Sequence, residues 1–410
     1  MNDNPNLEKR IKRHLWGQKF PLEVLTDSAF LPETLEELKS LGYKNWEEGD
    51  WGIRGIGSFH DLYRLNIQLS TPGRIVLEVA RFKAGAREQL FRRARALPWE
   101  LWFGRPEGLI FDIRTHFHGA LIHHEGQGKQ ALDEAIRARL EEFWGSASDS
   151  LRVIPGPRTQ RIYLDISGSN VLLFLDTSGD HLGKRGYRLA PGPAPLAENR
   201  AAAIIRKLAR IQPDPQWILD GMTGSGTFAF ESSLFFQGLS VGGGRDFAFS
   251  QWPSYRESTK NYWSRQRIEP NVRVGQNEKV KVIANDRDDR SLGAAKMNLD
   301  QFRSRFCTGG REPRFVKGDF FSLSSKADEF IGPGWVFLNP PYDYRISGSL
   351  DQFANKLTRW IETSGLEGTL VLLLPQNRIV EKFSSIPRVF DDLVFNHGGR
   401  GVNLLGLSLK

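Results

Sequence analysis

The run Asn339-Pro340-Pro341-Tyr342 has the composition to hold the amino group of a nucleobase. It follows WVFL (335–338), an apolar run that is typical of a buried strand. Proline fixes φ at about −65° and cannot extend a strand ladder, so the two prolines predict a stiff, extended turn. In such a turn the Asn339 side-chain oxygen and the Pro340 carbonyl can both accept hydrogen bonds from one NH2 group.

An exocyclic base amine is a poor nucleophile, because its lone pair is delocalised into the ring. Two acceptors can aim that lone pair at an electrophilic methyl group and stabilise the positive charge that develops. Tyr342 can stack on the base, which must leave its helix to be reached. We therefore predict that Asn339, Pro340, Pro341 and Tyr342 are catalytic, in preference to a turn that merely ends a strand.

A glycine-rich turn, DGMTGSGTF (220–228), lies between an apolar run and a predicted helix. Its glycines let the backbone approach a ligand closely, and the helix N-terminus offers unpaired N–H groups. A dinucleotide site requires a third glycine and an acidic residue about 20 positions further on, and this sequence has neither. The spacing Asp-x-x-x-Gly-x-Gly is the form that S-adenosylmethionine (SAM) enzymes use. The predicted cofactor residues of this turn are Asp220, Thr223, Gly224, Ser225, Gly226 and Thr227.

Two further acids close apolar runs. Asp286 lies in NDRDD (285–289) and could accept hydrogen bonds from both ribose hydroxyls. Asp319 lies in GDFF (318–321), where it could accept a hydrogen bond from the adenine amino group while Phe320 packs on the ring. We add Arg287 to the predicted cofactor set. Asp288 or Asp289 is the better candidate for the N-cap of the next helix.

The elements that must position these residues are short apolar runs separated by helical or linker sequence. Buried parallel strands have this pattern, so we predict an α/β fold with a doubly wound, Rossmann-like sheet. Ligands of such sheets lie beyond the carboxyl ends of the strands, where the polar residues that close the runs should converge. The runs are WILD (217–220), VIAND (282–286), FVKGD (315–319), WVFLNP (335–340) and TLVLLLP (369–375).

The first half of the chain has a different pattern, a mixture of short strands and helices. Residues 74–82 and 162–176 have strand-like alternation, whereas 86–103 and 128–144 have helical spacing. The proline-rich stretch LAPGPAPLAEN (189–199) stops regular structure. We therefore predict two domains, residues 1–188 and residues 189–410, with a small helical insert near 242–281. The aromatic residues of this insert could contact RNA or form a small core of their own.

The amino-acid composition of the chain excludes several classes of protein and favours nucleic-acid binding. Of 410 residues, 40% are hydrophobic and 25% charged, and 56 basic against 48 acidic residues leave a formal charge of +8. That balance favours a polyanionic partner, most simply nucleic acid. The single cysteine, Cys307, excludes an internal disulfide and Cys-based zinc clusters, and disfavours thiolate attack on a pyrimidine ring. No stretch is long and apolar enough for a signal peptide or a membrane span, so we expect a cytoplasmic protein.

Two basic stretches are candidates for phosphate contact, with a solvated helix face as the alternative. The predicted RNA-binding residues are Arg81, Lys83, Arg87, Arg92, Arg93, Arg95, Lys184, Arg185 and Arg188. The histidines of 116–124 could suggest a metal site, but no carboxylate or thiol cluster accompanies them, and we predict none.

The series DGMTGSGT, NDRDD, GDFF and NPPY resembles class I SAM-dependent methyltransferases that act on exocyclic amines. More specifically, it is similar to the THUMP-domain RNA methyltransferases, the family of the large-subunit ribosomal RNA guanine-N2 methyltransferase. The similarity continues upstream in the segments 62–84, 97–103 and 175–208. Thr223 stands where the family usually has cysteine, and Asp343-Tyr344-Arg345 departs from the residues that usually follow NPPY.

The resemblance implies a ferredoxin-like plus THUMP RNA-binding module before a Rossmann-like methyltransferase domain, with SAM as cofactor and ribosomal RNA as partner. The favoured function is methyl transfer to guanine N2 of ribosomal RNA. The first alternative is adenine-N6 methylation of DNA or RNA, because both amines need the same acceptors. The second alternative is a non-catalytic RNA-binding or ribosome-assembly factor. The sequence does not determine the oligomeric state.

Overall fold

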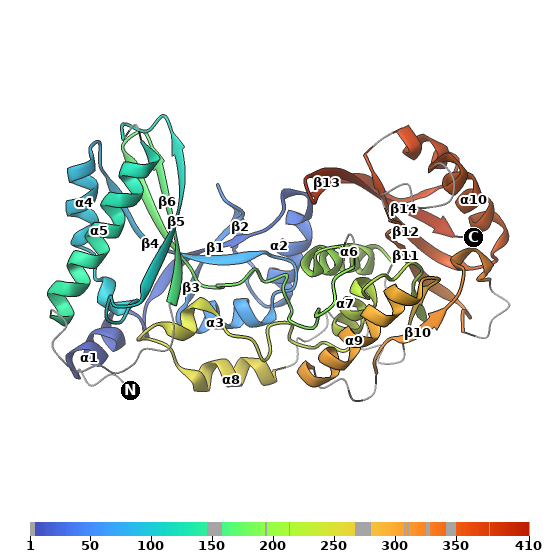
Figure 1. The fold of residues 1–410 in the computed structure, drawn as a ribbon, viewed down its shortest axis with the longest axis horizontal. Coiled ribbons are helices and arrows are strands. Elements are labelled where there is room, and N and C mark those ends of the chain that lie inside the picture. The colour runs from blue at the N-terminus through green and yellow to red at the C-terminus, as the bar shows by residue number, and fades with distance from the viewer. Residues whose placement is uncertain are drawn as a thin grey trace.

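The chain folds around two seven-stranded sheets, one in each of two lobes (Figure 1). This computed structural model describes residues 5–122, 124–145, 158–192, 195–212, 214–266, 280–306, 309, 311–324, 329–341, 350–376 and 378–409. The first sheet uses strands from the first half of the chain, and the second sheet uses strands from the second half.

The first sheet has the strand order β2-β3-β1-β4-β7-β6-β5, and only β5 and β6 pair in parallel. Its strands are β1 (Lys19–Leu25), β2 (Glu47–Glu48), β3 (Ile53–Ser58), β4 (Arg74–Lys83), β5 (Leu109–His118), β6 (Arg158–Ser167) and β7 (Asn170–Asp176). The strand-like stretch 162–176 thus forms most of a hairpin, which turns at Gly168 with φ +59°.

Helices cover one face of this sheet. They are α1 (Pro5–His14), α2 (Leu31–Ser40, after the short turn η1, Ser28–Phe30), α3 (Phe59–Gln68), α4 (Arg87–Arg95) and α5 (Glu125–Trp144). Leu90 of α4 and Leu132 of α5 share one hydrophobic core with Ile162 and Leu164 of β6. The helical stretch predicted over 86–103 is divided, because Pro98 interrupts the ladder before η2 (Trp99–Leu101).

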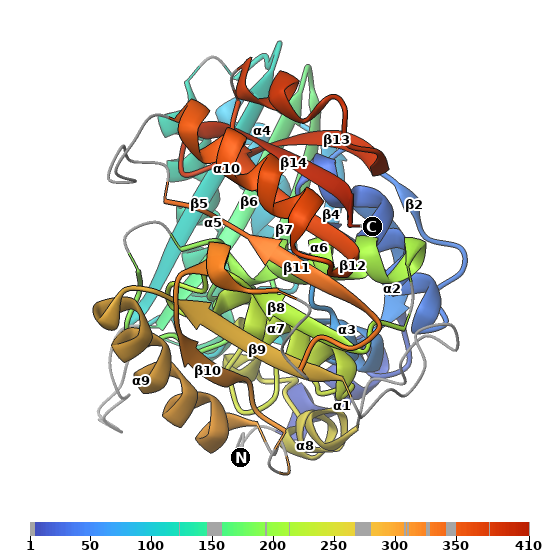
Figure 2. The same cartoon turned by 90° about the vertical axis from the view of Figure 1, so that its right-hand side faces the viewer.

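The second sheet has the order β10-β9-β8-β11-β12-β14-β13, seen strand by strand in Figure 2. Its strands are β8 (Trp217–Asp220), β9 (Lys281–Asp286), β10 (Arg314–Lys317), β11 (Pro333–Leu338), β12 (Glu367–Pro375), β13 (Arg388–His397) and β14 (Arg400–Leu409). The five predicted strands are present and parallel. The antiparallel hairpin β13–β14, at the edge of this sheet, was not predicted.

Helices lie on both faces of the second sheet, which confirms the doubly wound fold. Helices α6 (Glu198–Ile211) and α7 (Thr227–Phe236) share a core with Ile218 and Phe337 on one face. Helix α10 (Leu350–Thr363) packs with Leu219 and Leu338 on the other face. Helix α9 (Asp289–Arg305) follows β9 and packs beside α7. The strand order reverses between β8 and β11, so a ligand crevice is expected at their carboxyl ends.

The segment after α7 joins the core of the first lobe, which differs from the expectation of an RNA contact or a separate small core. It contains η3 (Ala248–Gln251) and α8 (Glu257–Arg265), while residues 267–279 lie outside the described part. Trp252 is buried against Phe59 and Trp102, and its indole N–H donates to Gln160 at 2.9 Å. Trp252 and Trp263 are thus buried in the core of the first lobe, whereas Tyr262 is exposed.

A buried polar network also connects the lobes. Glu37 of α2 accepts hydrogen bonds from the N–H and hydroxyl groups of Ser70 and Thr71, and pairs with Arg206 of α6 at 2.7 Å. Arg185 is 1% exposed, pairs with Glu231 of α7 at 3.3 Å and donates to the Ser70 carbonyl. The Ser70 loop of the first lobe is therefore tied to two helices of the second.

Removing one partner of the buried Arg185–Glu231 pair should lower the free energy of unfolding. Arg185→Met leaves the Glu231 carboxylate buried without its cation, and we expect a loss of about 3–5 kcal/mol in the free energy of unfolding. Arg185→Met combined with Glu231→Met should recover much of that loss, because no unpaired charge remains. Urea denaturation of the single and double variants measures both values.

The matched control is Lys184→Met, because Lys184 is an exposed neighbour of Arg185. We expect this variant to change stability by less than about 0.5 kcal/mol. Equal losses in Lys184→Met and Arg185→Met would contradict the role assigned to the buried pair.

Candidate functional site

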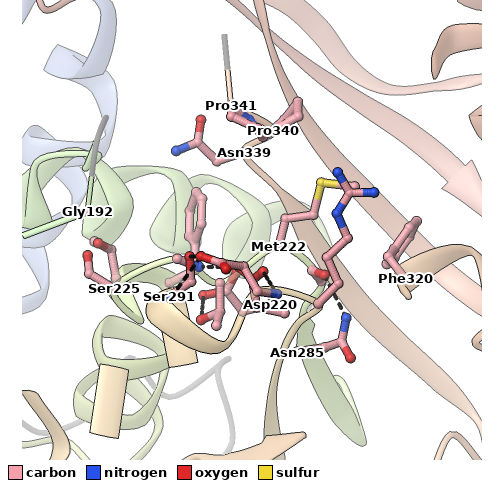
Figure 3. A pocket seen from close by; sticks show the side chains of 18 of the residues that line it. Gly192, Asp220, Met222, Ser225, Asn285, Ser291, Phe320, Asn339, Pro340 and Pro341 are labelled. Carbon is pink, nitrogen blue, oxygen red and sulfur yellow. Dashed lines mark hydrogen bonds between the residues drawn. The ribbon is translucent and has the colours of Figure 1, made fainter. Parts of the chain in front are cut away.

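A cleft of ≈ 460 Å³ lies at the switch point of the second sheet. Parallel pairing of β8 with β9 and β11 brings three strand ends to its floor. Figure 3 shows Asn339, Pro340 and Pro341 together, across the cleft from Asp220 and Ser291. Predicted residues that line the cleft are Asp220, Thr223, Gly224, Ser225, Thr227, Asp286, Arg287, Asp319, Phe320, Asn339, Pro340 and Pro341.

The glycine turn requires glycine for two separate reasons. Gly226 is the N-cap residue of α7 and has φ +92°, and a Cβ atom there would lie 2.5 Å from the Phe230 ring. Gly224 has φ +54°, and a Cβ atom there would have no neighbour within 4 Å. Because Gly224 also lines the cleft, the space beside it is open to a ligand that approaches the backbone.

Asp220 stabilises the conformation of this turn through hydrogen bonds. Its carboxylate is buried and accepts hydrogen bonds from the Thr223 hydroxyl at 2.8 Å and from the Ala229 N–H at 3.2 Å. Burial raises the pKa of Asp220 from 3.8 to about 7, and repulsion from Asp286 acts in the same direction. Thr223, the departure from the family pattern, supplies one of the two donors that this carboxyl needs.

Asp286 joins the second strand end to the glycine turn. One carboxylate oxygen accepts from the Gly224 N–H at 2.9 Å and the other from the Asp288 N–H at 3.0 Å. A carboxylate oxygen can accept two hydrogen bonds, so both oxygens keep capacity for ligand hydroxyls. Asp288 is the N-cap of α9 and accepts from the Ser291 N–H, which confirms one of the two predicted caps.

Asn285 fixes the spacing of the strand ends, a role that sequence reasoning missed. Its side-chain NH2 donates to the Gly221 carbonyl at 3.0 Å and to the Gly318 carbonyl at 3.2 Å. Its backbone carbonyl accepts from the Thr223 N–H at 2.9 Å. One buried side chain therefore holds the ends of β8, β9 and β10 together.

The predicted catalytic turn lies at the end of β11. Asn339 is half-buried, Pro340 is buried and Pro341 is exposed, and all three line the cleft. This places Asn339 and Pro340 beside the same space as Gly224 and Asp286. Tyr342 and residues 343–345 lie outside the described residues.

The third strand end has one buried and one exposed residue. Phe320 is 2% exposed and its ring lies 4.3 Å from that of Trp360, so only part of it borders the cleft. Asp319 is exposed, and Lys356 lies 3.7 Å from its carboxylate. Phe321 and Phe353 also line the cleft.

The linker between the lobes supplies a wall of the cleft through Gly192, Pro195 and Leu196. Asn298 of α9 fastens it, because its side-chain oxygen accepts from the Leu189 and Ala190 N–H groups. Its NH2 group donates to the Ala190 and Ser225 carbonyls. An asparagine at a buried position of an amphipathic helix was the one signal in the sequence that could have indicated this contact.

The predicted RNA-binding residues do not form one surface. Arg185 is buried in the network between the lobes, so its assignment to RNA is wrong. Arg188 donates to the Thr227 hydroxyl at 2.7 Å beside the cleft. Five further cations have carboxylate partners: Arg81 with Glu78, Arg87 with Glu134, Arg95 with Glu142, Lys184 with Asp180 and Arg188 with Glu198. Lys83, Arg92, Arg93 and Lys184 are exposed.

Metal binding and membrane insertion are two further possibilities for the described residues. No group of three or more His, Cys, Asp or Glu side chains among them could hold a metal ion. His123 and Cys307 lie outside that part of the chain. Within the same part, every helix is too short or too polar to cross a bilayer.

The chain is similar to curated RNA methyltransferases. It is 28% identical over 266 residues to "Putative RNA methyltransferase YpsC" of Bacillus subtilis (strain 168), a match covering 65% of this chain and 66% of YpsC. It is 28% identical over 333 residues to ribosomal RNA large subunit methyltransferase K/L of Cellvibrio japonicus (strain Ueda107), covering 76% of this chain. That match spans 41% of the K/L protein, so the chain corresponds to about two fifths of it.

A solved structure and a family model agree with the fold. SMU.472 in complex with SAH superposes with a TM-score of 0.76 and 22% identity, covering 96% of this chain and 99% of that one. The family model described as "RMKL-like, methyltransferase domain" matches residues 185–393, just over half of the chain. The chain belongs to the RMKL-like methyltransferase domain family. The matched range of this domain contains the glycine turn, Asp286 and Asn339, so it includes the cleft.

The raised pKa of Asp220 should make stability depend on pH. Between about pH 4 and pH 7 the folded carboxyl binds a proton that the unfolded chain has released, so the free energy of unfolding should fall as pH rises. The contribution should be lost above about pH 7, with a total of about 4 kcal/mol at most. Asp220→Asn lacks this group and should not show that fall.

Urea denaturation of wild type and Asp220→Asn at pH 5 and pH 8 measures the difference. We expect the variant to gain stability relative to wild type on going from pH 5 to pH 8. A difference between the two proteins that is constant with pH would show that Asp220 titrates normally.

Proposed function

We propose that this protein is a SAM-dependent RNA methyltransferase that transfers a methyl group to an exocyclic base amine, with guanine N2 of ribosomal RNA as the favoured target. One observation carries this proposal. Asn339 and Pro340 border the same cleft as the glycine turn and Asp286. A paired acceptor for an amine and a nucleoside-type cradle are thus adjacent.

The residues of the cleft fit SAM. Asp286 presents a carboxylate for ribose hydroxyls, Asp319 an acceptor for an adenine amino group, and the open side of Gly224 admits a ligand to the backbone. Asp220 gives the turn its shape and adds negative charge when ionised, which suits a cationic ligand. SAM bound in this cleft supplies an electrophilic methyl group.

The catalytic turn acts on the base. Asn339 and Pro340 can accept the two N–H groups of an exocyclic amine, which orients the nitrogen lone pair and stabilises positive charge on nitrogen. The methylated amine then releases one proton to solvent water and returns to neutrality. Because the prolines restrict the backbone, the two acceptors keep their position without reorganisation during the reaction.

RNA is favoured over DNA because both curated relatives are named RNA methyltransferases. The formal charge of +8 suits either nucleic acid. The acceptors cannot distinguish guanine N2 from adenine N6, so adenine-N6 methylation is the second candidate. A non-catalytic RNA-binding or assembly factor has less support, because the cleft keeps both the acceptor turn and the strand-end acids.

Asn339→Ala should separate chemistry from cofactor binding. Loss of one acceptor should lower kcat by about 100-fold or more, in line with the removal of one oriented group from a catalytic site. SAM affinity, measured by calorimetry, should change by less than about threefold, because SAM is held by other strand ends. Transfer of labelled methyl groups to RNA measures kcat.

A suitable control is Asn396→Ala, since Asn396 lies near the end of β13 and accepts from the Gly399 N–H. It should retain wild-type kcat. Wild-type turnover in Asn339→Ala would refute the catalytic role of this residue.

The modified nucleoside decides among the three functions. We expect one N2-methylguanosine to be missing from the RNA of cells that lack the protein, in comparison with RNA from complemented cells. Digestion of both RNA samples to nucleosides, followed by mass spectrometry, measures this difference. Loss of N6-methyladenosine would establish the second candidate. No change in any nucleoside, together with no SAM binding, would favour the non-catalytic role.

A further inference from the structure

Asn298 of α9 lies between the linker and the glycine turn and contacts both. It is fully buried, and its side-chain oxygen accepts hydrogen bonds from the Leu189 N–H at 2.8 Å and the Ala190 N–H at 2.9 Å. Its NH2 group donates to the Ala190 carbonyl and to the Ser225 carbonyl, each at 3.0 Å. An amide side chain has two donor hydrogens and two acceptor lone pairs, so all of them are used here. One side chain therefore holds the start of the linker against the glycine turn.

Arg188 makes a second connection, at the other end of the linker. Its guanidinium group donates to the Leu196 carbonyl at 2.8 Å and to the Thr227 hydroxyl at 2.7 Å. Leu196 precedes α6 by two residues, and Thr227 is the first residue of α7. Glu198 lies 3.5 Å from the guanidinium group and balances its charge. The linker is thus attached to the glycine turn at both ends, by Asn298 and by Arg188.

Between these attachments the linker approaches the glycine turn closely. Both Gly192 and Ser225 line the cleft. A Cβ atom added to Gly192 would lie 3.8 Å from the Ser225 backbone nitrogen and 4.0 Å from the Ser225 Cβ atom. These are ordinary van der Waals distances, so the gap between the two residues has room for a small group. We call this gap between Gly192 and Ser225 the slot.

The slot lies away from the part of the cleft that suits the nucleoside of SAM. Asp319 and Phe320 are the candidates for adenine, and Asp286 is the candidate for ribose. In Figure 3, Gly192 and Ser225 lie together on one side of the cleft and Phe320 lies on the opposite side. SAM is an elongated molecule whose amino-acid chain extends from the ribose away from the adenine. The slot is therefore the part of the cleft that remains for the amino-acid end.

We propose that Asn298 is a positioning residue for the cofactor, which sets the width of the slot and thereby the affinity for the amino-acid end of SAM. Asn298 acts through the Ala190 and Ser225 backbones that it holds, because it is not among the described residues that line the cleft. A wall that is already in place need not be ordered when the ligand binds, and this increases affinity. The inference deepens the proposed function and rests on it, because methyl transfer requires SAM in this cleft.

Helix α9 does not depend on Asn298 for its own packing. Leu299 and Phe302 of α9 share a hydrophobic core with Phe230 of α7. Phe302 is fully buried, and its ring lies 4.9 Å from the Phe230 ring. A substitution at Asn298 that keeps its size should therefore act on the linker and leave the helix in place.

Asn298→Asp tests the role with little change in shape. The carboxylate still accepts from the linker N–H groups, but it cannot donate to the Ala190 and Ser225 carbonyls, which then face a negative oxygen. The linker should move away from the glycine turn and widen the slot. Calorimetry with two ligands measures the effect, S-adenosylhomocysteine (SAH) and 5′-methylthioadenosine. Both contain adenine, ribose and a thioether sulfur, and only SAH has the amino-acid end.

We expect Asn298→Asp to bind SAH about tenfold more weakly, because two buried carbonyls lose their donors. Its affinity for 5′-methylthioadenosine should change by less than about threefold, since this ligand does not reach the slot. In methyl-transfer assays the KM for SAM should rise about tenfold while kcat changes by less than about threefold, because the acceptors at the end of β11 are untouched.

Gly192→Ala tests the slot without removing a hydrogen bond. Its φ lies outside the left-handed region, so alanine is compatible with the backbone, and the added methyl group would lie beside the Ser225 nitrogen. This group takes up space that the amino-acid end needs. SAH affinity should fall about tenfold and 5′-methylthioadenosine affinity should be retained, in line with the effect of one methyl group in a close-fitting pocket.

The matched control is Asn66→Asp, at a buried asparagine of the first lobe. Asn66 of α3 is also fully buried, and its NH2 group donates to the Leu62 carbonyl at 2.9 Å and to the Thr177 hydroxyl at 2.8 Å. Its side-chain oxygen accepts from the Ser178 hydroxyl at 2.7 Å. Urea denaturation should show that Asn66→Asp and Asn298→Asp lower stability by similar amounts, whereas only Asn298→Asp should weaken SAH binding.

Three results would overturn the positioning role while leaving the proposed function in place. They are equal losses of affinity for SAH and 5′-methylthioadenosine in Asn298→Asp, an equal loss of SAH affinity in Asn66→Asp, and unchanged SAH affinity in Gly192→Ala. Failure of the wild-type protein to bind either SAM or SAH would overturn the proposed function together with this inference.

Discussion

The parallel pairing of β8 with β9 and β11 is the constraint on which the site depends. It brings the ends of three strands to one edge, so that Asp220, Asp286 and Asn339 border one cleft although they are far apart in sequence. Asn285 then fixes the distances between strand ends with two donated hydrogen bonds. Without this pairing, the glycine turn and the proline turn would be unrelated loops.

Burial at this edge has an electrostatic cost that the turn partly offsets. Asp220 is removed from water, and its two donors, the Thr223 hydroxyl and the Ala229 N–H, do not restore a normal pKa. A carboxyl that titrates near neutral pH lies directly under the predicted cofactor position. The cleft therefore holds a group whose charge can respond to a cationic ligand, whereas Asp286, tied to two backbone N–H groups, is held in a fixed orientation.

The two lobes are connected by more than a linker. Trp252 and Phe249, from the segment after α7, belong to the hydrophobic core of the first lobe. Arg185 and Glu231 form a buried pair at the junction, and Arg185 reaches the Ser70 loop. Because α7 begins at the glycine turn, the same helix takes part in both the cleft and the junction. The position of the cleft relative to the first lobe is thus fixed by packing and charge.

The sequence alone determined the five parallel strands of the second sheet and the residues that close them, since short apolar runs closed by Asp286, Asp319 or Asn339 are local patterns that need no tertiary information. It did not determine which polar side chains form contacts with residues far away in the sequence. Arg185 stands in a basic stretch like its neighbours, and only the fold places it in a buried pair with Glu231. The contacts of Asn298 and of the linker wall were likewise decided by tertiary structure, because burial and hydrogen-bond partners depend on segments about a hundred residues away, whose positions no local pattern specifies.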